Sequence, residues 1–226
     1  MATNLATFFE TSKKIRGGKS VWVKDGNGEN RASVLSGCTI ANPPKGFGYL
    51  WAAQLFQFTL GEPGYIFRTF GVKTATATAG DTTIYLNGDG YSDIPEVGMV
   101  LMVAPTSLVD YTGQSGLVTA VTYDSATEKF AVVLDTSIGA LTTDSIVVEA
   151  AGSAASATAS VLVPNPNTFI ETDKELIPTN GMYGLENVNH SISPIYEKKA
   201  YIARMQPLPA YVLEKNRSLI GGIFWI

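Results

Sequence analysis

Hydrophobic and polar positions alternate over short stretches in the middle of the chain, which is the pattern of β-strands. Residues 82–86, 117–123, 129–134 and 145–149 are rich in β-branched side chains and are separated by Gly, Asn, Asp, Ser and Thr. Residues 97–103 are almost all apolar, which predicts a strand buried on both faces. Five or more short strands in about 80 residues favour a small β-barrel or β-sandwich.

The sequence on either side of this region also favours strands. Residues 21–35 predict a β-hairpin around the turn cluster at 24–30. Residues 49–60 fit a helical face as well as a strand, and we favour a strand because the second half is rich in β formers. We also expect a loop at 41–48, a turn at 61–64, strands at 65–70 and 195–205, and a short helical turn at 211–216. The predicted fold is therefore all-β (mainly β).

Charge and aromatic content divide the chain into two parts. Residues 71–165 contain two basic and ten acidic side chains, a balance of −8; because the whole chain is −4, the flanks carry +4. All three Trp and nine of the ten Phe also lie in the flanks. We interpret 71–165 as an inserted β-barrel or sandwich domain that projects as a knob. Residues 1–70 and 166–226 are then a discontinuous β-rich base with an N-terminal arm.

Two low-complexity or charged segments have more than one interpretation. The Ala/Ser/Thr-rich segment 150–160 has the composition of a linker, but together with residues 74–79 it could equally form two β stems leading into and out of the insert. Residues 13–19 form a basic, glycine-containing run, which is typical of a solvated arm. The alternative is a docking arm that lies across a neighbouring subunit.

Composition excludes several classes of protein. The chain has 226 residues, of which 45% are apolar, enough to bury a core. Only 16% are charged, against about 25% in typical domains, so the surface suits packing against neighbours. A net charge of −4 argues against a general nucleic-acid binder. Neither a signal peptide nor a membrane-spanning segment is predicted, and we expect synthesis in a cytoplasm.

The residues that carry chemistry are sparse. His190 is the only histidine and Cys38 the only cysteine, so neither a zinc site nor a histidine-activated nucleophile is indicated. Gly-rich phosphate-binding loops are absent from the sequence. The Asp- and Asn-rich stretches 25–30 and 87–93 resemble calcium ligands only loosely, and hairpin turns require the same residue types. We favour turns, with Asp89 and Asp93 as the better metal candidates; no cofactor and no catalytic residue are expected.

Large aromatic side chains in the flanks are the best candidates for anchoring residues. Each one is either part of the core of the base or part of an interface with a partner, and burial in the core is the commoner outcome. The apolar C-terminus needs burial in the same way, in the base or in a partner. The candidates are Trp22, Trp51, Phe56, Phe58, Phe224 and Trp225.

The insert resembles small β-barrel modules of tailed-bacteriophage virion proteins. The resemblance covers about 80 residues; it rests on the segment 75–86, on a Val-Gly-Met-Val-Leu strand at 97–101, and on a Val-Thr-Ala-Val hairpin with an Asp/Thr tip at 118–130. The whole chain is similar to head auxiliary, or capsid decoration, proteins of crAss-like phages.

This resemblance implies a non-enzymatic structural role. The base would bind the capsid shell and the knob would face outward, with the major capsid protein or other virion proteins as partners and several copies forming a homo-oligomer. Neither nucleic acid nor membrane would be bound, and the protein would be located in the virion after assembly in the host cytoplasm. The alternatives are a neck or tail component and a small major-capsid-like protein. An alternative of another class is a carbohydrate-binding or glycan-hydrolysing β protein, because an acid-rich domain can contain the pair of carboxylates that glycoside hydrolysis uses.

Overall fold

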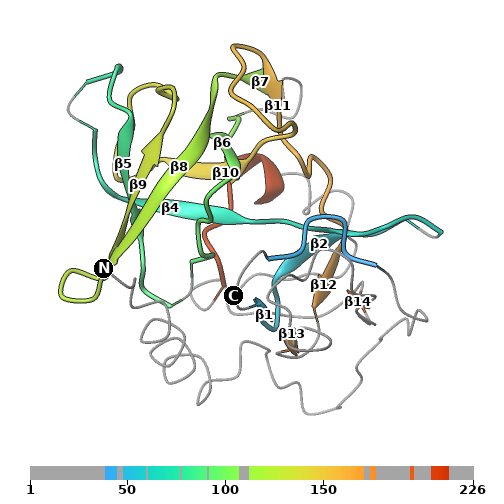
Figure 1. The fold of residues 1–226 in the computed structure, drawn as a ribbon. Helices are drawn as coiled ribbons and strands as arrows, with labels where there is room; N and C mark the ends of the chain where they lie inside the picture. Colours follow the sequence, from blue (N-terminus) through green and yellow to red (C-terminus); the bar gives the residue numbers. More distant parts are fainter. Residues whose placement is uncertain are drawn as a thin grey trace. The chain divides into compact units, whose positions relative to one another are not determined.

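In the computed structural model, the regular structure of the described residues is almost all β, with a single turn of helix, which confirms the predicted all-β fold (Figure 1). It separates into two compact units, and each is described by itself. Among the described residues, unit 1 contains 68–164 and 206–213, and unit 2 contains the remainder. The structure describes residues 39–44, 48–59, 61–76, 78–90, 92–106, 112–170, 174–176, 194–195 and 205–213.

Unit 1 is organised around a closed barrel of six antiparallel strands. The strands pair in the order β10-β4-β5-β9-β8-β6, and β6 pairs with β10 to complete the circle. Every neighbouring pair is antiparallel. The strands are β4 (Thr69–Thr74), β5 (Thr83–Asn87), β6 (Val100–Val103), β8 (Ser115–Asp124), β9 (Lys129–Leu134) and β10 (Ile146–Glu149).

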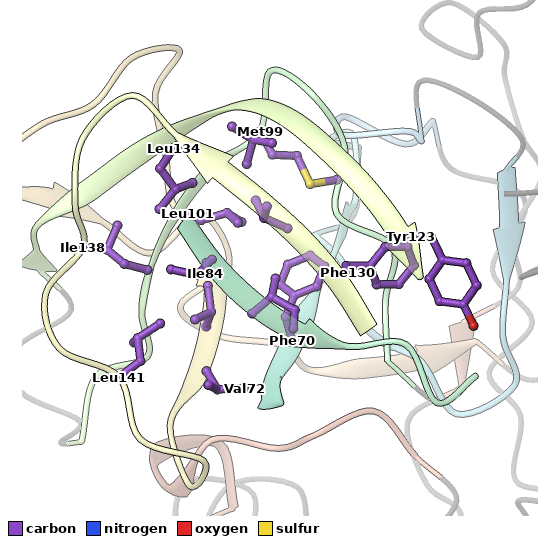
Figure 2. Close-up of a cluster of buried hydrophobic side chains, with 14 residues drawn as sticks. Phe70, Val72, Ile84, Met99, Leu101, Tyr123, Phe130, Leu134, Ile138 and Leu141 are labelled. Carbon is purple, nitrogen blue, oxygen red and sulfur yellow. The ribbon is translucent and has the colours of Figure 1, made fainter. Parts of the chain in front are cut away.

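The barrel interior is filled by the apolar half of each alternating strand. In β5, Ile84 and Leu86 are fully buried while the residues between and beside them are half-exposed, which is the period of two that a half-buried strand requires. Both side chains belong to a cluster with Phe70 and Phe130, and Figure 2 shows Ile84 inside the barrel with these rings. The rings of Tyr123 and Phe130 lie 4.9 Å apart between centroids, so aromatic packing fills one end of this core.

The Ala/Ser/Thr-rich segment 150–160 is paired at both ends within unit 1, so the linker interpretation was wrong. Ala150 forms a bridge with Val161, and the N–H of Ala151 donates to the carbonyl of Ser160. The returning strand β11 (Ala159–Ser160) pairs with β7 (Thr112–Gly113). Backbone pairing orders the segment, although its side chains are small, because it satisfies the N–H and C=O groups. Its strand partner is β7 and not residues 74–79.

The strand predicted at 97–103 begins only at Val100. The N–H of Met99 donates to the carbonyl of Glu96, and Gly98 has a φ of 88°, so residues 96–99 form a turn that glycine permits. Val97 projects from this turn and is 55% exposed, although a strand buried on both faces was predicted there. Apolar content alone did not reveal the turn.

A segment near the C-terminus belongs to unit 1, whereas the composition had placed it in the base. Residues 210–213 form one turn of helix, which overlaps the helical turn predicted at 211–216. The hydroxyl of Thr69 donates to the carbonyl of Pro207 at 2.6 Å, and Tyr211 and Val212 are buried. Within the described residues, no helix is long and apolar enough to cross a membrane.

Unit 2 contains a four-stranded antiparallel sheet in the order β14-β12-β2-β3 and a separate pair, β1 with β13. Two asparagine side chains extend the pairing. Asn42 bonds both the N–H and the C=O of Ile66, and Asn167 does the same for Phe58. The strands are β1 (Gly48–Leu50), β2 (Leu55–Gln57), β3 (Tyr65–Ile66), β12 (Thr168–Ile170), β13 (Lys174–Leu176) and β14 (Pro194–Ile195).

Two predicted strands of the N-terminal flank are each interrupted. The strand expected at 49–60 is divided by a turn in which Ala53 has a φ of 66° and the N–H of Gln54 donates to the carbonyl of Trp51. The strand expected at 65–70 is divided after Ile66, and β4 begins at Thr69. Turns formed by residues without a strong turn preference leave no clear trace in the sequence.

Candidate functional site

The two aspartates considered for a metal site instead hold backbone in unit 1. The Oδ1 atom of Asp89 accepts the N–H of Ser92 at 3.1 Å, and the Oδ2 atom of Asp93 accepts the N–H of Thr69 at 2.9 Å. The Asp89 bond fits the turn interpretation, in which an Asp side chain caps a nearby N–H group, whereas the Asp93 bond joins residues 24 apart in the sequence. Among the described residues, no group of three or more His, Cys, Asp or Glu side chains is placed to hold a metal ion. His190 and Cys38 lie outside the described residues.

A buried ion pair joins two strands of the barrel. Arg68, which precedes β4, donates from Nη1 to Oε2 of Glu149, the last residue of β10, at 3.1 Å. The two side chains are only 7% and 13% exposed. Because both charges are removed from water, loss of either partner would leave the other as an uncompensated buried charge. The pair is 81 residues apart in sequence, so the sequence offered only the hint that each charge adjoins an apolar strand.

The outward side of β5, β9 and β8 presents mostly uncharged side chains. We call this surface the outer face, and it alternates with the buried residues shown in Figure 2. Its charges lie at one end, where Asp124 of β8 pairs with Lys129 of β9. The Nζ atom of Lys129 lies 4.7 Å from the centre of the Tyr85 ring, a cation–π contact. Val133 is 37% exposed. The outer face consists of Thr83, Tyr85, Asn87, Ala120, Thr122, Asp124, Lys129, Ala131 and Val133.

The hairpin tip between β8 and β9 is fixed by Asp124. Its carboxylate accepts the hydroxyl of Thr127 at 2.6 Å and the N–H of Ala126 at 3.0 Å. These bonds, with the hydroxyl first, lower the pKa of Asp124, so the group is ionised at neutral pH. Burial, followed by the charges of Glu128 and Asp124, raises the pKa of Tyr123, which stays protonated and donates to the carbonyl of Gly88.

Two loops are joined by hydrogen bonds at the end of the barrel opposite the β8–β9 hairpin tip. The N–H of Thr76 donates to the carbonyl of Leu141, and the N–H of Leu141 donates back to the hydroxyl of Thr76. The hydroxyl of Ser137 donates to the carbonyl of Ala79 at 2.6 Å. These reciprocal bonds make the loops at 75–82 and 135–145 a joined rim.

The aromatic anchors that the structure describes are buried in unit 2. Phe56 is fully buried, and Trp51 and Phe58 are 4% and 7% exposed. Phe56 and Phe58 belong to a cluster with Ile40, Leu50, Ile66 and Ile170. Burial in the core of this unit gives all three side chains a structural role. The other three candidates, Trp22, Phe224 and Trp225, lie outside the described residues, as do the predicted hairpin at 21–35 and the basic run at 13–19.

The arrangement in unit 1 is thus a closed, well-packed barrel that displays one rim of two joined loops and a mostly uncharged outer face. Comparison with protein-family models, with curated proteins and with solved structures gives no match to the chain. The geometry of the described residues therefore carries the functional argument.

Proposed function

We propose that this chain is a non-enzymatic structural protein of a tailed-phage virion, which binds the capsid shell and decorates or stabilises it. The observation that carries the proposal is the closed six-stranded barrel, because residues 71–165 are the part of the sequence that resembles virion β-barrel modules. A closed barrel has fewer free strand edges than an open sheet, which limits unwanted association when many copies are concentrated on one particle.

Charge and composition support the same proposal. Residues 71–165 carry a balance of −8, while the flanks carry +4. A projecting acidic domain stays solvated, and a mildly basic base can bind an acidic shell surface. The partners in this proposal are the major capsid protein or other virion proteins, and repeated copies would add avidity.

Copy number in purified particles tests the location. Quantitative mass spectrometry should find on the order of hundreds of copies per particle for a decoration protein, and about a dozen for a ring at the neck or tail. Absence of the chain from purified particles contradicts a virion role altogether. A copy number equal to that of all shell positions, with no other shell protein present, would favour a small major-capsid-like protein.

Removal of the barrel tests which part binds the shell. The deletion should take out residues 68–164 together with 206–213, because both belong to unit 1. We expect the remaining chain to bind purified particles with an affinity within about threefold of the full chain, since the proposal assigns docking to the base. Loss of binding by a deletion variant that is still folded would contradict this assignment.

A further inference from the structure

Strand β8 is longer than its neighbour on one side. It runs for ten residues, but β6 pairs only with Ser115–Leu117. Val118 then bonds through both backbone groups to the turn before β6, from Gly98 N–H and to Met99 C=O. From Thr119 to Thr122 the strand pairs with β9 alone. Within the part of the chain that the structure describes, no hydrogen bond reaches the backbone of these four residues from the side opposite β9.

Apart from the β-bulge between Val118 and Ala120, this free edge lacks the features that normally protect one. Natural edge strands carry Lys, Pro or inward charges that block pairing with another chain. Residues 119–122 are Thr-Ala-Val-Thr, without charge or proline, and Thr119, Ala120 and Thr122 are exposed. The bulge in β8 lies before Ala120, so the rest of the edge continues in regular pairing with β9. An exposed edge of this kind can accept an added strand.

The two ends of the edge are acidic. The turn beside Val118 carries Glu96 and the exposed Val97, and the other end carries the ionised Asp124 and the exposed Glu128. A complementary strand would therefore have an uncharged, β-prone centre with basic residues on both sides. It would also offer an apolar side chain to Val97.

One segment of this same chain has that composition. Residues 13–24, outside the described residues, contain five basic side chains and no acidic one. Within them, Lys19 and Lys24 enclose Ser20–Val23, a stretch of Ser, Val, Trp and Val. We propose that residues 13–24 of a second copy add to the free edge of β8 as a strand, with Ser20–Val23 opposite Thr119–Thr122.

The contact is heterologous, because the donated segment and the accepting edge are different surfaces. Repetition of such a contact gives a ring or an open chain of copies. This self-association concerns unit 1 and the N-terminal segment alone, and it does not rest on the proposed location in a virion.

The experiment is sedimentation velocity of the full chain over a range of concentrations at low salt. We expect the wild-type chain to associate. The edge variant Ala120→Lys/Thr122→Lys should associate about tenfold or more weakly, because lysines on an edge strand block its pairing and also repel the basic donor segment. The matched control is Thr83→Lys/Ala131→Lys. It adds the same charges to the same outer face, but on β5 and β9, whose edges are both paired; it should associate like the wild type.

The donor is tested with Lys19→Glu/Lys24→Glu, which should weaken association to a similar extent, and with a synthetic peptide of residues 13–24. Amide hydrogen exchange on the wild-type chain should show Thr119–Thr122 slowed by this peptide and unaffected by a peptide with its basic residues changed to Glu. A chain that stays monomeric, or a peptide that leaves these amides unchanged, overturns the proposal. Association that is lost in the edge variant but kept in the donor variant also overturns it, because another strand then occupies the edge.

Discussion

At the scale of the residue, Gly116 in β8 is required by the close approach of the neighbouring backbone. A Cβ added there would overlap the carbonyl oxygen of Thr136 and would lie 3.2 Å from Leu134 side-chain atoms. We expect Gly116→Ala to lower the free energy of unfolding by about 3 kcal/mol, since a backbone carbonyl cannot move aside easily. Urea denaturation followed by circular dichroism measures the change.

The matched control for that substitution is Gly80→Ala. Gly80 is exposed, and the nearest atom to an added Cβ is the Thr78 hydroxyl at 3.9 Å. Its effect should stay within about 0.5 kcal/mol. Equal effects of the two substitutions would show that the barrel adjusts at Gly116.

Asp124 gives the hairpin tip a dependence on pH. Its pKa in the folded chain is lowered from the ordinary 3.8 by the Thr127 hydroxyl and the Ala126 N–H. A lowered folded pKa contributes stability above the unfolded value, and that contribution is lost as the pH falls through the folded pKa. Asp124→Asn should therefore be less stable than wild type at neutral pH, and the difference should shrink in acid below pH 3.8.

Thermal melts of both chains between neutral and acidic pH check this prediction. The control is Asp144→Asn, which removes an exposed carboxylate from a loop of the same unit. A difference between wild type and Asp124→Asn that stays constant across the whole range would mean that the ionised carboxylate is not the stabilising species.

At the scale of the element, the Arg68–Glu149 pair fixes the beginning of β4 against the end of β10. Because the pair is buried, loss of one partner leaves an uncompensated charge, and we expect Arg68→Met or Glu149→Gln to cost about 3 kcal/mol each. The double variant Arg68→Met/Glu149→Leu should be considerably more stable than either single one, since no lone charge remains.

Urea denaturation of the two single variants and the double variant measures the coupling. Lys73→Met serves as the control, because Lys73 lies on β4 but is exposed. Additive effects of the Arg68 and Glu149 substitutions would contradict a direct interaction between them.

The strands predicted most accurately are those that the local alternation of apolar and polar residues determines. The strand predicted at 129–134 has the observed bounds of β9, and the one predicted at 145–149 differs from β10 by a single residue. Alternation alone specifies such strands, because every second side chain must enter the core. The turn at Ala53 was missed because its residues lack strong turn preferences, and the turn at 96–99 was missed because the apolar run around Gly98 resembles a buried strand.

Features that depend on contacts between distant residues could not be predicted from the sequence. Nothing in either neighbourhood specifies that Arg68 meets Glu149, or that the edge of β8 continues past the end of β6. The same is true of the segment 206–213, whose composition matches the flanks although it packs within unit 1. Composition reports how apolar a segment is, and not which partner will cover it.

At the scale of the whole molecule, residues 206–213 complete unit 1. Tyr211 and Val212 are 0% and 1% exposed, and Pro207 accepts the hydroxyl of Thr69. We expect a protein of residues 68–164 joined by a short linker to 206–213 to be more stable than 68–164 alone by about 3–5 kcal/mol, from burial of the two side chains.

Thermal unfolding of the two proteins measures this difference. A variant of the joined protein with Tyr211→Ala should lose much of the gain, by about 3 kcal/mol, because a large cavity or exposed surface remains. Equal stability with and without the added segment would contradict the assignment of 206–213 to unit 1.

The pairing of β2 with β12 has a consequence for the chain while it is still being made. Phe58, which follows β2, bonds to Asn167, 109 residues later. At about 5–20 residues per second, β2 emerges from the ribosome roughly 5–20 s before its partner. Throughout that delay the chain must keep Leu55 and Phe56 away from other nascent chains, while the barrel strands are synthesised in between. Inserting a domain between paired strands thus leaves β2 without its β12 neighbour for that interval.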